Sequence, residues 1–217
     1  MEVTWLGHAF FKIKTEPKKG EEVMIAIDPY DLSIGLTSKS FPADILLITH
    51  DHYDHNNRKL IEGNPFLISG PGEYEVKGVY IEGIEGYHDD KKGLERGKIT
   101  MYTIESEGLR ICHLSDLGQK ELTDRQLERI GDIDILLIPV GGVYTISHKE
   151  APGIISQIGP KIVIPMHYAL PGLKIKLDGV DKFLKEIGAK EPERLKKIKI
   201  RKRDLPSETK IILLEYK

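Results

Sequence analysis

The stretch ILLITHDHYDH, residues 45–55, decides how we interpret this 217-residue chain. Its aliphatic half predicts a short strand, Ile45–Thr49, that is buried on both faces. Three of the eight histidines and two aspartates follow within the next six residues. Because α/β folds present reactive groups where strands end, we expect a functional loop here rather than a solvated histidine-rich loop.

The spacing within this loop suits metal binding. His50 and His52 can point to one side of a tight loop, while Asp54 and His55 turn toward a second position. Neutral imidazole and carboxylate together favour Zn²⁺, with Fe and Mn as alternatives. Four residues cannot close two metal sites, so further ligands must come from later in the chain. The candidates lie at the ends of other predicted strands or just after them: His88, His113, Asp116 and His167.

The rest of the chain predicts two β-rich regions, each followed by helix and strand segments. Further strands are expected at Val3–Leu6, Phe10–Lys14, Val23–Ile27, Phe66–Ser69, Glu73–Ile84, Ile99–Glu105, Leu109–Leu114, Ile135–Pro139, Lys161–Pro165, Ile198–Lys202 and Lys210–Tyr216. Helices are expected at His55–Glu62, from Thr123 to about Ile130, from Ser147 onward and at Val180–Ile187. The helices after Thr123 and Ser147 both open with capping-box spacing, although Pro152 and Gly153 weaken the second. With no long linker in the sequence, we expect residues 1–217 to form one domain.

Composition excludes several classes of protein. The net charge is −2, from 32 basic and 34 acidic residues, so the chain as a whole is not built to bind nucleic acid. A single cysteine excludes a disulfide framework and a four-cysteine zinc cage. The apolar runs are too short to span a membrane and there is no secretory signal, so we expect a cytoplasmic protein.

Residues 190–203 carry eight Lys or Arg and two Glu. Without interleaved aromatics, they favour an exposed charged strand over an anion-binding or nucleic-acid patch.

With these residues in view, the chain resembles the metallo-β-lactamase-fold hydrolases. The run HDHYDH, residues 50–55, matches their His-x-His-x-Asp-His signature. Other matching stretches are WLGH (5–8), IDP (27–29), GYH (86–88), LSDLG (114–118), IPVGG (138–142) and IPMHY (164–168). They are similar to the branch that includes the L-ascorbate-6-phosphate lactonases, over residues 1 to about 190. This resemblance implies an α/β (α+β) class fold, a four-layer αββα sandwich with the metal site at one edge.

The resemblance also implies a binuclear metal centre, with zinc as the expected metal and Mn or Fe as alternatives. One ion would be held by His50, His52 and His88, the other by Asp54, His55 and His167, and both by Asp116. Ser115 stands where the family commonly has glycine. We prefer His88 to His113 as the third ligand of the first ion, because His113 lies on the buried face of an alternating strand. His88 instead follows a glycine-flanked strand end, in a loop that can reach inward.

The implied function is metal-dependent hydrolysis, in which a hydroxide bridging the two ions attacks a small ester or lactone-type substrate. Asp54 would be a ligand and also the catalytic residue that accepts a proton or orients the nucleophile. His8 could contact substrate, or be a buried histidine satisfied by backbone. Arg96 could grip an anionic group, or be a solvated loop residue. Asp28 could orient a ligand histidine, or be a turn carboxylate before proline.

Other functions stay open beside this one. The same fold could serve a phosphodiesterase or nuclease, or a non-hydrolytic metal-binding or redox protein. We expect a small-molecule substrate, no membrane partner and no nucleic acid. The oligomeric state is left open, with a homo-oligomer among the options.

Overall fold

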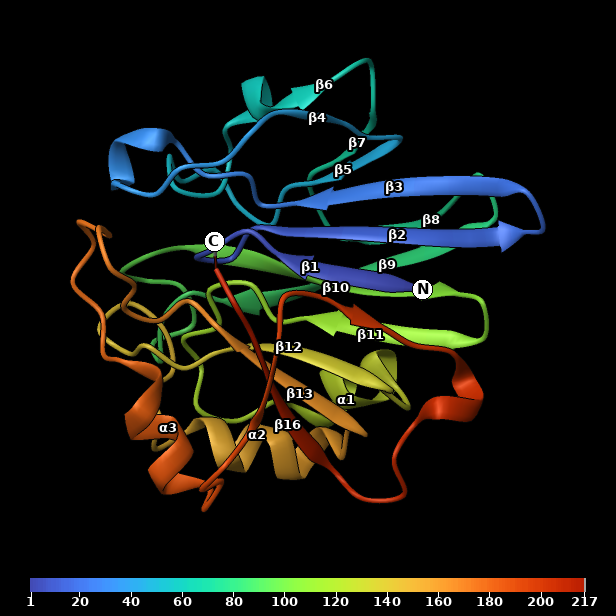
Figure 1. Ribbon diagram of the computed structural model, residues 1–217. Helices are drawn as coiled ribbons and strands as arrows, with labels where there is room; N and C mark the ends of the chain where they lie inside the picture. Colours follow the sequence, from blue (N-terminus) through green and yellow to red (C-terminus); the bar gives the residue numbers. More distant parts are fainter. Residues whose placement is uncertain (217) are drawn as a thin grey trace.

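Two β-sheets packed face to face form the body of the computed structural model, which describes residues 1–216 (Figure 1). The first sheet contains β1 (Glu2–Trp5), β2 (Phe11–Lys18), β3 (Glu21–Ile27), β5 (Ile45–Leu47), β7 (Phe66–Ile68) and β15 (Ile198–Lys199), in the order β15-β1-β2-β3-β5-β7. The second contains β8 (Gly72–Val76), β9 (Val79–Tyr87), β10 (Lys98–Ser106), β11 (Leu109–His113), β12 (Ile135–Pro139), β13 (Ile162–Met166), β14 (Glu193–Leu195) and β16 (Lys210–Leu214), in the order β14-β16-β13-β12-β11-β10-β9-β8. The predicted two-sheet sandwich is confirmed.

The outer face of the second sheet is covered by helices. These are α1 (Asp124–Ile130), α2 (Ala151–Ile158) and α3 (Val180–Glu186), which lie below that sheet in Figure 1. Every residue of β12 and β13 is buried, which explains their unbroken apolar sequences. The capping box predicted for α1 is present, because Thr123 and Gln126 each bond the other's backbone N–H.

The outer face of the first sheet is covered differently. A second hydrophobic core lies there, built around Phe10, Tyr30, Ile34 and Leu60. Its cover consists of two 3₁₀ helices, η1 (Leu32–Ile34) and η2 (Arg58–Leu60), and the short strand pair β4 (Phe41–Pro42) and β6 (Ile61–Glu62). Within residues 1–216 no α-helix lies in this layer, so the fourth layer of the sandwich is not helical in the way we expected.

The helix expected at His55–Glu62 is therefore wrong. The backbone N–H of Asn57 donates to the Pro29 carbonyl at 2.7 Å, and the Asn57 amide donates to the Tyr30 carbonyl at 3.1 Å. The Tyr53 carbonyl in turn accepts from the Asp31 N–H. These bonds tie the segment to the loop after β3. The next turn closes as a 3₁₀ helix, with the Leu60 N–H bonded to the Asn57 carbonyl, and Ile61 and Glu62 are extended because they pair with β4.

Two further predictions need correction. The strand expected at Glu73–Ile84 is a hairpin, β8 and β9, because Lys77 and Gly78 both have positive φ and form a two-residue turn. The helix expected from Ser147 begins only at Ala151. Glu150 does bond the Ser147 N–H and hydroxyl, but this turn precedes the helix, whose first turn accommodates Pro152.

The basic segment 190–203 lies on exposed edge strands and loops. Five of its eight cations are paired with carboxylates, as follows: Lys197 and Lys199 with Glu2, Arg201 and Arg203 with Asp204, and Lys202 with Asp134. Much of the local charge is thereby neutralised, which supports the interpretation of an exposed charged strand. Among residues 1–216, no helix is long and apolar enough to cross a membrane.

Candidate metal centre

The histidines and aspartates singled out in the sequence converge at one edge of the sandwich. This edge gathers the carboxyl ends of strands that run in one direction, because β3 and β5 are parallel in the first sheet and β11, β12 and β13 in the second. The loops that follow these strands, together with those after β1 and β9, carry the candidate residues. Parallel strands share their carboxyl edge, so side chains far apart in sequence meet there.

Four non-glycine residues within three positions of these strand ends have left-handed backbone. They are His8, Asp28, Ser115 and His167, with φ between 51° and 56°. Such conformations are uncommon outside glycine and tend to persist where the surrounding structure enforces them, as at functional sites. Each of these residues directly follows a strand or lies within three residues of its end, so the strain turns the chain sharply at the site.

The first group of potential metal ligands is His50, His52 and His88, whose ligand atoms all lie within 4.8 Å of one another. His50 Nε2 is 3.0 Å from His52 Nδ1. His88 Nδ1 donates to the Tyr144 carbonyl at 3.1 Å, which leaves Nε2 free to bind a metal.

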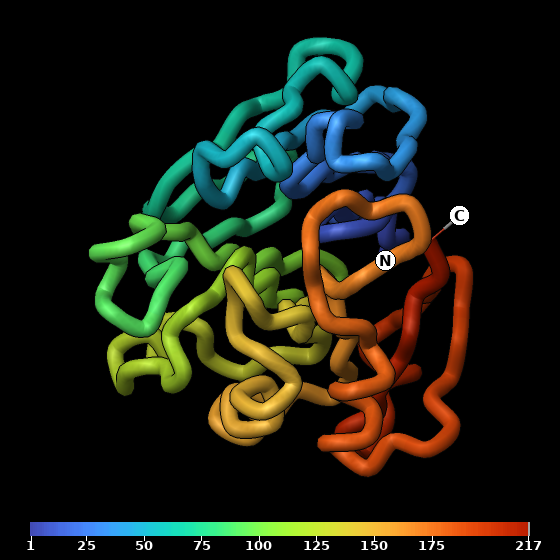
Figure 2. The backbone as a smooth tube through the Cα atoms, turned by 90° about the vertical axis from the view of Figure 1, so that its left-hand side faces the viewer, coloured from blue at the N-terminus to red at the C-terminus, as the bar shows by residue number. Residues whose placement is uncertain are grey.

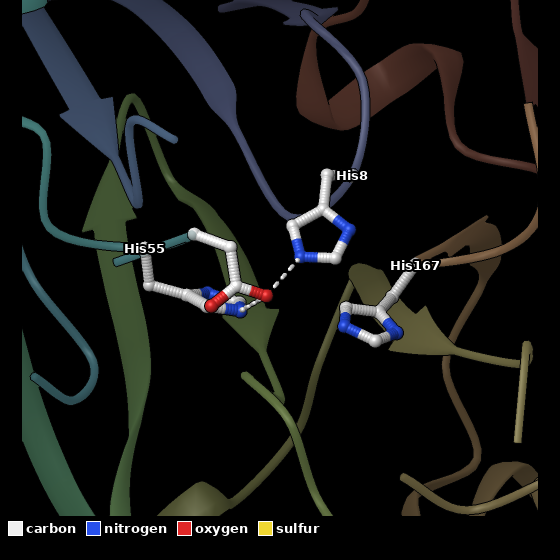
Figure 3. A group of neighbouring side chains, drawn as sticks. His8, His55 and His167 are labelled. Atoms are coloured by element: carbon white, nitrogen blue, oxygen red, sulfur yellow. Dashed lines mark hydrogen bonds and ion pairs between the residues drawn. The ribbon is translucent and has the colours of Figure 1, made fainter. Parts of the chain in front are cut away.

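The second group, shown in Figure 3, is His8, Asp54, His55 and His167, also within 4.8 Å of one another. His55 Nδ1 donates to Asp28 Oδ2 at 3.0 Å, so its Nε2 faces the group. His8 Nε2 lies 3.1 Å from Asp54 Oδ2. Substrate contact and a buried histidine were both open for His8, and its ring is fully buried and directed at Asp54.

Asp116 lies between the two groups. Its Oδ2 is 3.1 Å from His167 Nε2, 3.2 Å from His55 Nε2 and 3.4 Å from His88 Nε2. One carboxylate oxygen thus contacts members of both groups. This is the position that a bridging ligand would need.

The chemistry of these donors fits a cation. His88 carries its ring proton on Nδ1, as its bond to the Tyr144 carbonyl requires, so its Nε2 lone pair faces the Asp116 carboxylate. This lone pair and the carboxylate oxygen repel each other unless a positive charge lies between them. Within residues 1–216, His55 Nε2 and Asp116 Oδ1 are buried without a hydrogen-bond partner, a costly arrangement that a divalent ion would relieve.

The protonation states also suit metal binding. Burial lowers the pKa of His50 to about 2 and also lowers the pKa of His88, so both rings are neutral near pH 7. Burial acts to raise the pKa of Asp116, but the neighbouring His167 and His55 hold it well below its usual value. His50 and His88 are therefore neutral and Asp116 is ionised, which are the forms that bind metal. Burial acts to lower the pKa of His55, but Asp116 and Asp28 raise it well above its usual value, so a metal bound at this ring would displace a proton.

Asp28 behaves as an orienting residue. Its carboxylate is fully buried and accepts hydrogen bonds from the Thr49 N–H, the Thr49 hydroxyl and His55 Nδ1. Thr49 Oγ1 also lies 2.9 Å from His50 Nδ1, which donates to it. A single carboxylate thus fixes one histidine of each group, directly or through Thr49.

His113 lies outside both groups. Its Nε2 donates to the Ala9 carbonyl at 3.0 Å, and its Nδ1 accepts from the Ser115 N–H at 3.0 Å. With both nitrogens occupied and the ring buried, it has no lone pair to offer a metal. It instead holds Ser115, the strained residue that precedes Asp116.

Two glycines permit the close approach of the loops. A Cβ at Gly118 would lie 2.3 Å from the His88 carbonyl oxygen, and a Cβ at Gly141 would lie 2.1 Å from the His167 carbonyl oxygen. No other residue type fits without displacing a backbone that carries a candidate ligand. Both glycines belong to stretches that we matched in the sequence, but their role in packing is visible only in the fold.

A cavity of about 730 Å³ opens beside these groups, and His52, Asp54, His88, Asp116 and His167 line it. Arg96, for which a substrate contact and a solvated loop position were both open, lies on its wall, with its guanidinium 5.7 Å from the Tyr144 ring centroid. Lys174 and Lys176 also line the cavity, and sequence reasoning missed them. The signal that could have found them is the alternation LKIKL, residues 173–177, shortly after His167.

The loop that carries Arg96 is organised by Asp89. This nearly buried carboxylate accepts hydrogen bonds from four backbone N–H groups of the loop, those of Lys91, Gly93, Glu95 and Arg96, at 2.8 to 3.0 Å. Burial acts to raise the pKa of Asp89, but these bonds lower it to about 2. The backbone of Arg96 is therefore fixed relative to His88, the neighbour of Asp89.

Comparison with known proteins completes the description. Residues 2–167 match the model of the β-lactamase superfamily domain. A UPF0173 protein of Pyrococcus abyssi is 34% identical over 79% of this chain and 85% of its own length. A UPF0173 metal-dependent hydrolase of Thermococcus onnurineus is 30% identical over 77% and 84%. A crystal structure from Thermotoga maritima, described as that of a zinc-dependent hydrolase of the metallo-β-lactamase superfamily, is 37% identical, covers 100% of this chain and 99% of that one, and has a TM-score of 0.80.

Proposed function

The chain belongs to the metallo-β-lactamase superfamily of metal-dependent hydrolases, and from this premise we propose that it holds two divalent ions and hydrolyses a small anionic ester or lactone. The observation that carries the proposal is the position of Asp116. Its Oδ2 contacts His88 in one ligand group and His55 and His167 in the other. A carboxylate placed in this way can serve two ions at once.

We assign the ligands by the two groups. One ion is held by His50, His52 and His88, the other by Asp54, His55 and His167, and both by Asp116. Zinc is the proposed metal, because neutral imidazole with carboxylate is a common zinc donor set, and Mn and Fe are the alternatives. When bound, the ions supply a water of lowered pKa and polarise the oxygen that becomes negative in the reaction.

Within this site, residues of the chain orient the reacting groups and exchange protons with them. Asp54 is the proposed catalytic residue, because its carboxylate lines the cavity and can accept a proton from the attacking water. His8 donates to Asp54 Oδ2 through Nε2 and so fixes the carboxylate. Burial acts to raise the pKa of Asp54, but the hydrogen bond from His8 and the nearby His55 lower it, so this residue is ionised before reaction.

The proposed substrate class follows from the cavity. Its volume suits a small molecule. The Arg96 guanidinium on its wall can bind a phosphate or carboxylate with two hydrogen bonds. A substrate with a carbonyl beside the metal ligands and an anionic group beside Arg96 would be a charged ester or lactone. The phosphorylated lactones of the branch that the sequence resembles belong to this class.

Elemental analysis after reconstitution with Zn²⁺ or Mn²⁺ tests the binuclear centre. We expect about two ions per chain, and the same in a His148→Ala control, because His148 lies outside both ligand groups. Saturation at one ion would overturn the binuclear proposal. The fully loaded enzyme is then screened on lactones, thioesters and phosphodiesters. Turnover of phosphodiesters alone would replace the proposed substrate class.

A further inference from the structure

Two lysines on the wall of the metal-site cavity have no role in the function proposed so far. Lys174 and Lys176 lie on the loop of residues 169–178, between β13 and α3. We propose that they form, together with Arg96, an anion-binding rim that determines specificity for the charged end of the substrate. This inference rests on the proposed function, because the rim belongs to the same cavity.

The apolar neighbours of the two lysines hold this stretch of the loop against the fold. Leu173 and Ile175 pack against the second hydrophobic core, on the outer side of the first sheet. Lys174 and Lys176, at the intervening positions, are exposed and line the cavity. Ile175 also lines the cavity between the two lysines, so this stretch of the loop forms one wall of the cavity with an ammonium on each side of an apolar contact.

The backbone beneath the lysines is held in place. The Lys174 N–H donates to the Ile34 carbonyl at 2.7 Å, which ties the loop to η1. Gly35 and Gly172 meet so closely that a Cβ on Gly35 would lie 2.1 Å from the Gly172 oxygen. At the end of the loop, the Asp178 N–H donates to the Gly141 carbonyl at 2.8 Å. The loop is therefore a docked wall of the cavity.

Arg96 reaches the same cavity from a different loop. Figure 2 shows the orange loop that contains Lys174 and Lys176 and the green loop of residues 88–97 on different sides of this edge of the molecule. Asp89 fixes the backbone of the green loop through its four hydrogen bonds. Two separately anchored loops thus bring three cations to one cavity.

These cations lack strong internal partners. Within residues 1–216, no carboxylate lies within 4.0 Å of the ammonium of Lys174 or Lys176, and Arg96 has only its neighbour Glu95, at 3.9 Å. By contrast, Lys98 and Lys182 are paired at 2.9 and 2.7 Å. The carboxylates that line the cavity are Asp54 and Asp116, both proposed metal ligands. The rim is therefore available to a negatively charged ligand.

The composition of the rim indicates which anion fits. A planar guanidinium binds two oxygens at once, and each ammonium adds a point charge with several donors. A group with three oxygens and two negative charges, such as a phosphate monoester, satisfies all three cations. The reacting bond of the substrate is placed beside the two groups of metal ligands. The phosphate must therefore lie at the other end of the substrate.

The test compares the double variant Lys174→Gln/Lys176→Gln with the double control Lys149→Gln/Lys185→Gln. The control removes the same charge at exposed lysines outside the cavity that have no carboxylate partner within 4.0 Å in the described chain. Binding of inorganic phosphate to the metal-loaded protein is measured by calorimetry. Hydrolysis is measured on a phosphorylated sugar lactone and on the same lactone without phosphate.

We expect the rim variant to weaken phosphate binding and to raise KM for the phosphorylated lactone by about tenfold, while the neutral lactone and the control stay within about twofold. Equal effects on both lactones, or phosphate binding equal to that of the control, would overturn the rim. If the wild-type enzyme hydrolyses neither lactone, the proposed reaction fails, while phosphate binding still decides whether the rim exists.

Discussion

Replacing Asp28 with asparagine should loosen the metal centre without altering any proposed ligand. The Asp28 carboxylate accepts three hydrogen bonds, from the Thr49 N–H at 2.8 Å, the Thr49 hydroxyl at 2.6 Å and His55 Nδ1 at 3.0 Å. Through the Thr49 hydroxyl it also orients His50. The residue therefore acts on one histidine in each ligand group.

The magnitude follows from the number of donors. An asparagine has one acceptor oxygen where the carboxylate has two, and its amide N–H₂ must face donors on one side. At least one hydrogen bond to a charged group is lost, which costs about 1.5–3 kcal/mol and leaves a buried donor without a partner. Orienting residues of this kind change metal affinity by about 10- to 100-fold. We expect a loss within that range for Asp28→Asn.

The assay is a Zn²⁺ titration in competition with a chromophoric chelator, accompanied by urea unfolding of the metal-free protein. Asp134→Asn is the matched control, because Asp134 is also nearly buried and accepts the Arg110 N–H and the Lys202 ammonium, away from the metal groups. The control should lose stability and keep its zinc affinity. Wild-type zinc affinity in Asp28→Asn, or an equal loss in both variants, would refute the orienting role.

Three further outcomes are expected. His88→Ala should lose one bound ion and most activity, whereas His113→Ala should lower Tm and keep both ions; loss of an ion in the His113 variant would reverse the assignment. Gly118→Ala should reduce both stability and metal content, because its Cβ would lie 2.3 Å from the His88 oxygen, and a wild-type Tm would contradict this. Burial lowers the pKa of His113 below its usual 6.5, so the stability that its neutral form provides is complete above pH 6.5 and is lost as pH falls. Between pH 6.5 and 5 the wild-type protein should lose stability more steeply than His113→Gln, by up to about 1.4 kcal/mol per pH unit, in denaturant unfolding; equal slopes would exclude His113 as the cause.

Several features of the protein follow from its sequence alone, because they depend on neighbouring residues. The aliphatic run before the histidine loop predicts a buried strand, and β5 is buried throughout. The spacing of Thr123 and Gln126 predicts the start of α1, since a capping box needs only four consecutive residues. The seven ligand candidates could also be named in advance, because the chain has only eight histidines and its motifs resemble those of a known family.

The tertiary structure decided what depends on contacts between distant segments. The segment after His55 forms a 3₁₀ turn followed by β6, because Ile61 and Glu62 pair with β4, a contact that no local pattern reveals. His8 reaches Asp54 and Asp116 reaches both histidine groups only because two sheets place their strand ends at one edge. Lys174 likewise reaches the cavity because its loop bonds η1 and packs against a second core. Local sequence fixes which groups a segment carries, but their meeting requires the long-range packing that closes the sandwich.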